Sequence, residues 1–327
     1  MGNLREEVPA VPWLMLAEKE GKEESREFFD LSKDVTYSTS FPELVGKRCL
    51  GVGFPGWIFT ADEQKKMNLF HLFSRSVINL PDMDMLEGFD YEWERGSCRY
   101  YVEKAVISSN PLTTSDYVLA LIQGYPRCFA FWRPGQKSFT NVETPRRAYS
   151  DITWHGGQFY GVDFMGNIII FDFRGSEEYP TVATVVKGIP PSLTRGTQLY
   201  MVHSLGELLV ITRDGAFLDE DGSYGVKEFH VYKIDVDRES YEEVADLGNR
   251  ALFLGSSATL AVAQAYKIEG CKGNCIYFTD DCWQSYFNIE RGGGKDMGIY
   301  NLLDGTIEPH YTGESYHKFS PPLWIFK

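Results

Sequence analysis

The chain has 327 residues, of which 15% are aromatic, and its formal net charge is −14. That charge, without any run of five basic residues, argues against nucleic acid as a partner. No stretch of about 18 apolar residues occurs, so we expect no membrane span, and six unevenly spaced cysteines predict reduced thiols rather than a disulfide framework.

Residues 1–10 form a predicted N-terminal tail, ahead of one domain over residues 11–327. The segment from Met1 to Glu7 has neither the apolar core of a signal peptide nor a transit pattern rich in Arg and Ser. Glu6 occupies the position at which N-myristoylation prefers Ser or Thr. We therefore expect a cytoplasmic and/or nuclear protein, and a monomer.

Short β runs separated by Gly- and Asp-containing turns recur along the chain, and helical spacing is never sustained. The first strands are expected at Val11–Leu16, Phe28–Leu31 and Val35–Thr39. Five units of four antiparallel strands follow, at 47–82, 102–145, 149–187, 197–247 and 251–310. A repeat of about 40 to 50 residues made only of strands predicts an all-β fold, a single β-propeller.

One further strand is expected at Leu323–Phe326, and with the three N-terminal strands it completes a sixth blade. We predict that the N- and C-terminal strands close the ring in this blade, because an open ring would leave unpaired strand edges. Seven blades are the alternative, since the segment 83–101 has room for further strands.

Two glycine clusters resemble nucleotide-binding loops. The run from Gly51 to Gly56 matches the dinucleotide fingerprint letter for letter, but a strand, Trp57–Thr60, follows it where a helix is required, and Pro55 removes an amide donor. A hairpin turn is the better interpretation. The run Gly292–Lys295 lacks phosphate-loop spacing and indicates a flexible loop tip.

Catalytic and metal-binding patterns are not found in the sequence. Cys271, Cys275 and Cys282 lack a fourth zinc ligand at suitable spacing and are predicted to be buried thiols. The six histidines are scattered, and neither a Gly-x-Ser-x-Gly elbow nor a His-Glu-x-x-His motif occurs. We expect no catalytic residue, no cofactor and no metal.

Two long loops, about 213–227 and 281–296, join second to third strands of consecutive blades and should be neighbours on one face. Long loops in a compact repeat are often functional, and exposed Trp, Tyr and Arg are enriched at interfaces. The predicted partner-binding residues are Phe217, Leu218, Tyr224, Trp283, Tyr286, Phe287 and Arg291. Replacing Trp283 and Tyr286 with Ala is expected to abolish partner capture and leave the fold intact.

Several segments resemble the plant F-box-associated family with a KIB-type β-propeller domain, also catalogued as domain of unknown function 295. The resemblance extends over roughly residues 11–325. The segments that carry it are Pro12–Leu16, Ser204–Leu209, Phe229–Lys233, Leu247–Gly255, Gly270–Asp281 and Pro321–Trp324.

The resemblance implies a non-enzymatic protein-recognition module, similar to the substrate-receptor part of a ubiquitin-ligase adaptor. Family members commonly carry an F-box that docks on Skp1, and residues 1–10 are too few to hold one, so Skp1 and cullin are expected only if an F-box is supplied from elsewhere. One alternative is a propeller that binds or hydrolyses a sugar or another small ligand, with polar residues converging at the central funnel. Another is a degenerate paralogue that retains no partner.

Overall fold

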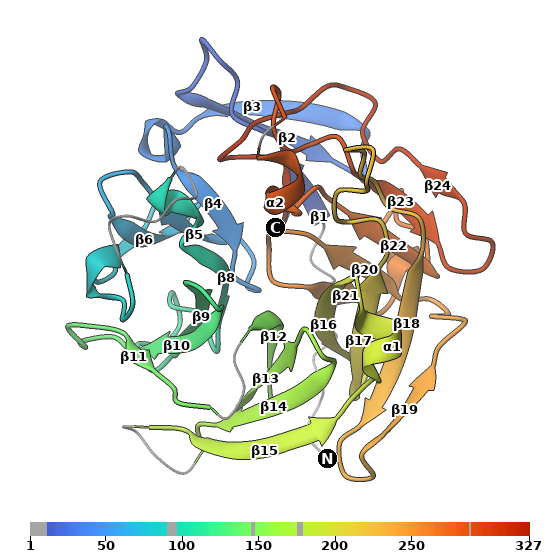
Figure 1. Ribbon diagram of the computed structural model, residues 1–327. Helices are drawn as coiled ribbons and strands as arrows, with labels where there is room; N and C mark the ends of the chain where they lie inside the picture. Colours follow the sequence, from blue (N-terminus) through green and yellow to red (C-terminus); the bar gives the residue numbers. More distant parts are fainter. Residues whose placement is uncertain (1–11, 90–96, 145–147, 175–178, 288) are drawn as a thin grey trace.

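Six β-sheets surround one axis in the structure, a computed structural model shown in Figure 1. The structure describes residues 12–327 except 90–96, 145–147, 175–178 and 288. From the innermost strand outward, blade 1 contains β25 (Leu323–Phe326), β1 (Pro12–Met15), β2 (Ser25–Asp30) and β3 (Val35–Ser40); blade 2 contains β4 (Arg48–Gly51), β5 (Trp57–Ala61), β6 (Met67–His71) and β7 (Val77–Asn79); blade 3 contains β8 (Val102–Ile107), β9 (Leu119–Gln123), β10 (Cys128–Trp132) and β11 (Thr140–Asn141).

The remaining blades continue in chain order around the ring. Blade 4 contains β12 (Tyr149–His155), β13 (Gln158–Asp163), β14 (Asn167–Asp172) and β15 (Thr181–Lys187); blade 5 contains β16 (Gln198–Ser204), β17 (Glu207–Arg213), β18 (Phe229–Asp235) and β19 (Ser240–Glu243); blade 6 contains β21 (Leu260–Val262), β20 (Ala251–Leu254), β22 (Cys275–Phe278), β23 (Gly298–Asn301) and β24 (Ile307–Glu308). The prediction of six blades is therefore confirmed.

Helical structure in the described residues is confined to single turns. They are α1 (Pro191–Thr194), α2 (Trp283–Tyr286), η1 (Pro42–Leu44), η2 (Met83–Met85), η3 (Cys98–Tyr100) and η4 (Ala265–Lys267). None of these has the length and apolar character that crossing a membrane requires. The segment 83–101, considered above for a seventh blade, contains η2 and η3, with residues 90–96 outside the described part. The predicted tail 1–10 and Val11 also lie outside it.

The two ends of the chain pair in blade 1, as predicted. β25 is antiparallel to β1, with Trp13 opposite Ile325 and Leu14 opposite Trp324. Successive side chains of a strand point to opposite faces. Trp324 therefore packs in a core cluster with blade 6 residues, whereas Ile325 packs in one that includes blade 2. One four-residue strand thus joins three blades.

Deleting residues 322–327 is expected to lower the melting temperature by at least about 10 °C, because four strand residues that are less than 10% exposed lose their contacts. The loss also leaves the edge of β1 unpaired. Thermal unfolding followed by circular dichroism measures the change. Deleting Lys327 alone, an exposed residue, is the control and should leave the curve in place, and an unchanged curve for the longer deletion would contradict the closure.

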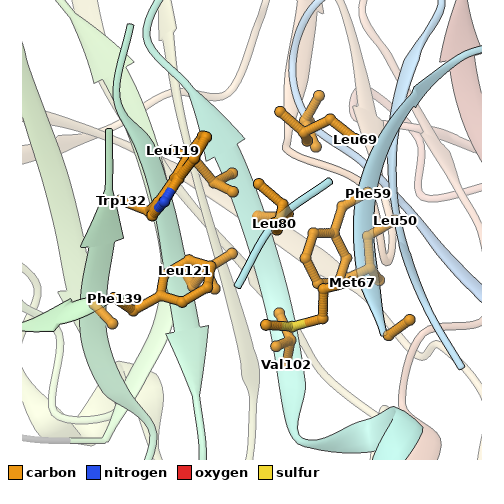
Figure 2. Close-up of a cluster of buried hydrophobic side chains, with 14 of the residues drawn as sticks. Leu50, Phe59, Met67, Leu69, Leu80, Val102, Leu119, Leu121, Trp132 and Phe139 are labelled. Carbon is orange, nitrogen blue, oxygen red and sulfur yellow. The ribbon is translucent and has the colours of Figure 1, made fainter. Parts of the chain in front are cut away.

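Apolar side chains between neighbouring blades form the core of the ring. Figure 2 shows the cluster between blades 2 and 3, where Leu50 and Phe59 face Leu121. All three are at most 1% exposed, and each contributes roughly 1.5–3 kcal/mol by leaving water. Because this packing is repeated between blades, each blade is held as a rigid support for the loops at its ends.

Blade 6 differs from the predicted set of four antiparallel strands. It has five strands, and β20 pairs with β22 in parallel and with β21 in antiparallel orientation. A parallel pair cannot be joined by a tight hairpin, so the chain leaves the end of β20, returns along β21, and passes through η4 before it enters β22. The connection between β20 and β21, residues 255–259, is buried throughout.

This connection, which we call the axial segment, crosses the middle of the ring. Its backbone accepts two hydrogen bonds from Lys104 Nζ of blade 3, at Gly255 O (2.7 Å) and at Ser257 O (3.0 Å). Ser257 Oγ donates to a blade 1 carbonyl, and the residue after it donates to Gly51 O of blade 2. A Cβ on Gly51 would lie 2.6 Å from Ser257 Oγ, so only glycine allows this approach. The axis is therefore filled by the protein's own chain.

Candidate functional site

In blades 1 to 5, whose strands alternate in direction, the connections from second to third strands and from blade to blade emerge on one side of the ring. We call this side the loop face. It carries the β17–β18 connection (214–228) and the β22–β23 connection (279–297). These two loops touch: Tyr224 OH donates to Asp280 Oδ2 at 2.7 Å, and Ser285 Oγ donates to Ala216 O at 2.8 Å. The prediction that the two loops are neighbours is confirmed.

Arg213, the last residue of β17, anchors the second loop at both ends. Its side chain is fully buried. Nη1 donates to Asp281 Oδ1 at 3.0 Å, and Nη2 donates to Asp296 Oδ2 at 2.6 Å. Tyr200 OH lies 3.0 Å from the same Asp281 oxygen and donates to it. A buried guanidinium with two carboxylates holds the loop to blade 5, as charge-assisted hydrogen bonds of this kind are strong.

Asp280 organises the far part of the same loop. Besides Tyr224, its Oδ2 accepts hydrogen bonds from the backbone N–H groups of Gly294 (3.0 Å) and Lys295 (3.2 Å). Burial raises the pKa of the Asp280 carboxyl to about 6 in spite of these donors. The interpretation of Gly292–Lys295 as a flexible loop tip was wrong for its glycines, which are buried. Gly294 has φ +127°, and a Cβ there would lie 2.0 Å from Ser315 O.

Three of the predicted partner-binding aromatics are core residues rather than exposed contacts. Trp283 is 4% exposed, Tyr286 1% and Tyr224 7%. They form one cluster with Tyr100. The ring of Tyr100 stacks on that of Trp283, with 4.8 Å between the ring centroids. The Arg48 guanidinium lies 4.5 Å from the ring centroid of Tyr100. Replacing Trp283 and Tyr286 with Ala is therefore now expected to destabilise the fold, because removing two large buried side chains creates cavities.

The other predicted residues reach the surface to different degrees. Leu218 is 47% exposed, Arg291 is exposed, and Phe217 and Phe287 are half-buried. Arg291 pairs with Glu314 at 3.0 Å. It lines a groove of about 630 Å³ whose other walls are residues 17–20 and 314–319. These four side chains stay candidates for partner contact.

Several exposed apolar side chains of blades 3 and 4 were not among the partner-binding residues predicted from the sequence. Tyr125 is 76% exposed, Met165 50%, Phe164 37% and Leu193 36%. They lie on the β9–β10 and β13–β14 connections and on α1. Phe164 lies 4.8 Å from the guanidinium of Arg127, two residues after Tyr125. With Leu218 of blade 5 they make up what we call the apolar arc. A sequence signal could have indicated the apolar arc: these turns of three or four residues carry aromatic or Met residues, where polar residues are usual.

The axis at the loop face is polar but nearly filled. Arg48, Glu103 and Lys104 line a space of about 20 Å³ there, which Trp283 covers. Trp283 Nε1 donates to Glu103 Oε2 at 3.4 Å, across 180 residues of sequence. Figure 1 shows α2 projecting inward over the ring. A space of this size holds about one water molecule.

The cysteines considered above for zinc are buried. Cys271 and Cys275 pack in the core cluster of blades 1 and 6, and burial raises the pKa of Cys271 to about 11. Cys282 precedes α2 and is 2% exposed. Among the described residues, no group of three or more His, Cys, Asp or Glu side chains is arranged to hold a metal ion.

The architecture defines a six-bladed propeller with a filled axis and a loop face fastened by buried ion pairs. The chain belongs to the KIB1-4 β-propeller family, whose model matches residues 28–301. Family membership and fold thus agree with the resemblance seen in the sequence.

Curated relatives from Arabidopsis thaliana are similar at low identity. F-box/kelch-repeat protein KIB1 is 26% identical over 91% of this chain and 74% of its own length, and F-box protein KIB4 is 26% identical over 97% and 84%. F-box protein SKIP23 is 26% identical over 69% of this chain, which spans 58% of that protein. Among solved structures, a chain of a nidogen/laminin complex aligns over 96% of this chain with a TM-score of 0.47 and 10% identity, a likeness too distant to carry an argument.

Proposed function

We propose that the chain is a non-enzymatic protein-recognition module that binds a partner protein on its loop face. The observation that supports this is the apolar arc on a face whose loops are anchored by buried groups. Apolar side chains gathered on one surface mark interaction sites. Rigid loops lose little conformational entropy on binding, which favours affinity.

The filled axis disfavours the alternative of a small-ligand or hydrolytic propeller. That alternative needs a funnel in which polar groups converge around a substrate. The polar groups do converge, but the axial segment and α2 leave about 20 Å³ between them. Ligand pockets are usually about 300–1,000 Å³.

The names of the relatives suggest the setting of this recognition. KIB4 and SKIP23 are F-box proteins by name, and an F-box docks on Skp1. We infer that this propeller captures the protein that a ubiquitin ligase of the cytoplasm or nucleus modifies. Skp1 and cullin would join the complex only through an F-box.

The apolar arc is expected to carry the capture. A tagged chain with Tyr125→Ser, Met165→Ser and Leu218→Ser should lose its specific partner from plant extract, read by mass spectrometry. The matched control replaces Leu205, Tyr266 and Leu303, exposed by 70%, 65% and 78% on the opposite side of the ring, and should keep the partner. Equal capture by both variants would move the site elsewhere. No specific partner for the unchanged chain would favour the degenerate-paralogue alternative.

A further inference from the structure

A small pocket opens on the loop face of blade 3, beside the apolar arc. It has a volume of about 130 Å³ and lies between the β9–β10 connection and the segment that enters β8. Glu87 and Glu143 line it, and both are exposed. None of the described residues that line it is Lys, Arg or His. Its walls therefore carry negative charge without a positive neighbour among them.

The hydrogen bonds in the pocket leave acceptors in excess. Gln123, 1% exposed, donates from Nε2 to Asn141 Oδ1 at 3.1 Å, and Asn141 Nδ2 donates to Glu87 Oε2 at 3.0 Å. Both amide groups are thereby oriented. Gln123 Oε1 accepts no hydrogen bond. A buried acceptor without a donor costs free energy, so a donor that reached Gln123 Oε1 would be favoured.

Three aromatic rings form part of the remaining wall. Tyr101 and Phe129 are buried beneath the pocket, and Tyr125, 76% exposed, stands at its rim. Long basic side chains pack their methylene stems on apolar surface and keep the charged end among polar groups. A guanidinium is planar, offers five donors and has no acceptor, and it matches carboxylates with two parallel hydrogen bonds.

We propose that this pocket receives an arginine side chain of the partner protein. The proposal rests on the proposed function and specifies the partner's chemistry: a basic residue enters between Glu87 and Glu143 while neighbouring residues cover Tyr125. An acidic chain, with a net charge of −14, also attracts a basic segment to this face at long range.

The test titrates the ¹⁵N-labelled chain with N-acetyl-arginine amide and with its neutral isostere, N-acetyl-citrulline amide. The arginine probe should shift the backbone signal of Gly124 and the side-chain NH₂ signal of Gln123 to saturation. Citrulline should bind at least about tenfold more weakly, since it lacks the charge-assisted pairs. Equal shifts with both probes would overturn the proposal. So would the absence of shifts with either probe at about 50 mM, the highest probe concentration used for so weak a complex.

Matched variants separate this pocket from other acidic surface. Glu87→Gln/Glu143→Gln should weaken arginine binding about tenfold, the effect of losing two charge-assisted hydrogen bonds. Glu220→Gln/Glu228→Gln, on the 214–228 connection, should not change it. Arg146 and Arg147 follow in sequence and lie outside the described residues. Arginine shifts that occur only in an Arg146→Gln/Arg147→Gln variant would assign the pocket to the chain's own arginines and overturn the proposal.

The probe experiment uses no partner protein, so its failure is distinguishable from a failure of the proposed function. If partner capture depends on the apolar arc but arginine and citrulline bind equally, the arginine-pocket proposal is contradicted and the protein-recognition proposal stands. If arginine binds but no protein is captured, the arginine-pocket proposal is supported and the protein-recognition proposal is contradicted.

Discussion

Replacing Arg213 with Met is expected to lower the free energy of unfolding by about 3–5 kcal/mol, because it leaves Asp281 and Asp296 as buried carboxylates without a cation. Both side chains are at most 7% exposed where they meet Arg213. The Met side chain has similar length and fills part of the space, so the loss is chiefly electrostatic. Urea unfolding of the two proteins at pH 7 measures the difference.

The matched control for Arg213 is Arg174→Met. Arg174 pairs with Asp172 at 2.5 Å, but its side chain is 59% exposed. Exposed ion pairs contribute about 0–1 kcal/mol, so this variant should unfold almost as the unchanged protein does. A loss below about 1 kcal/mol for Arg213→Met, as for an exposed pair, would show that other contacts hold the loop face, such as the aromatic cluster and the hydrogen bonds of Asp280. Partner capture should also weaken in Arg213→Met, since the loop 281–296 loses both of its anchors.

Replacing Lys104 with Met is expected to lower the free energy of unfolding by a similar amount, about 3–5 kcal/mol. Lys104 Nζ lies 3.6 Å from Asp151 Oδ1, and the two side chains are 5% and 0% exposed. Asp151 Oδ2 also accepts from Thr259 Oγ1 at 2.6 Å, so the pair fastens the axial segment to blades 3 and 4. The double variant Lys104→Met/Asp151→Asn should lose less than the sum of the single variants, because neither charge is then left unpaired.

The pH dependence of Lys104→Met supplies a second measurement. Burial raises the pKa of Asp151 above its ordinary value, and Lys104 opposes that rise, so the variant should raise this pKa further. A raised carboxyl pKa means that the folded state binds the proton more tightly than the unfolded state does. Stability is therefore lost as the pH rises above the unfolded value. Lys104→Met should lose more stability than the unchanged protein as the pH rises above 3.8, the ordinary pKa of this carboxyl, and parallel profiles would contradict the pairing.

Contacts with distant parts of the chain account for why the loop-face residues were partly mispredicted. From the sequence, Trp283 and Tyr286 lie in a long loop, and aromatic residues in a loop suggest an interface. Their burial depends on Tyr100, which enters the ring ahead of blade 3 and stacks on Trp283. Leu218 and Arg291, in the same two loops, stay exposed, and Arg291 pairs with Glu314 at the surface.

The sequence by itself determined most of the strands, their grouping into six blades and the pairing of the chain ends. The strands follow from local alternation of apolar residues and from turn residues, and the end pairing follows from the need to leave no open strand edge. The parallel pair of β20 and β22 in blade 6 was not predicted. The adjacency of the two long loops also followed, because consecutive blades must lie side by side in a ring.

Only the tertiary structure decided which of those loop residues are exposed, that residues 255–259 fill the axis, and that the apolar arc and the acidic pocket lie together. Each depends on contacts between residues far apart in the chain, such as Trp283 with Glu103 and Lys104 with Gly255. Those contacts are favourable because each buried charge or ring meets a partner that lies far away in the sequence. A single sequence specifies such pairs only through the fold that brings them together.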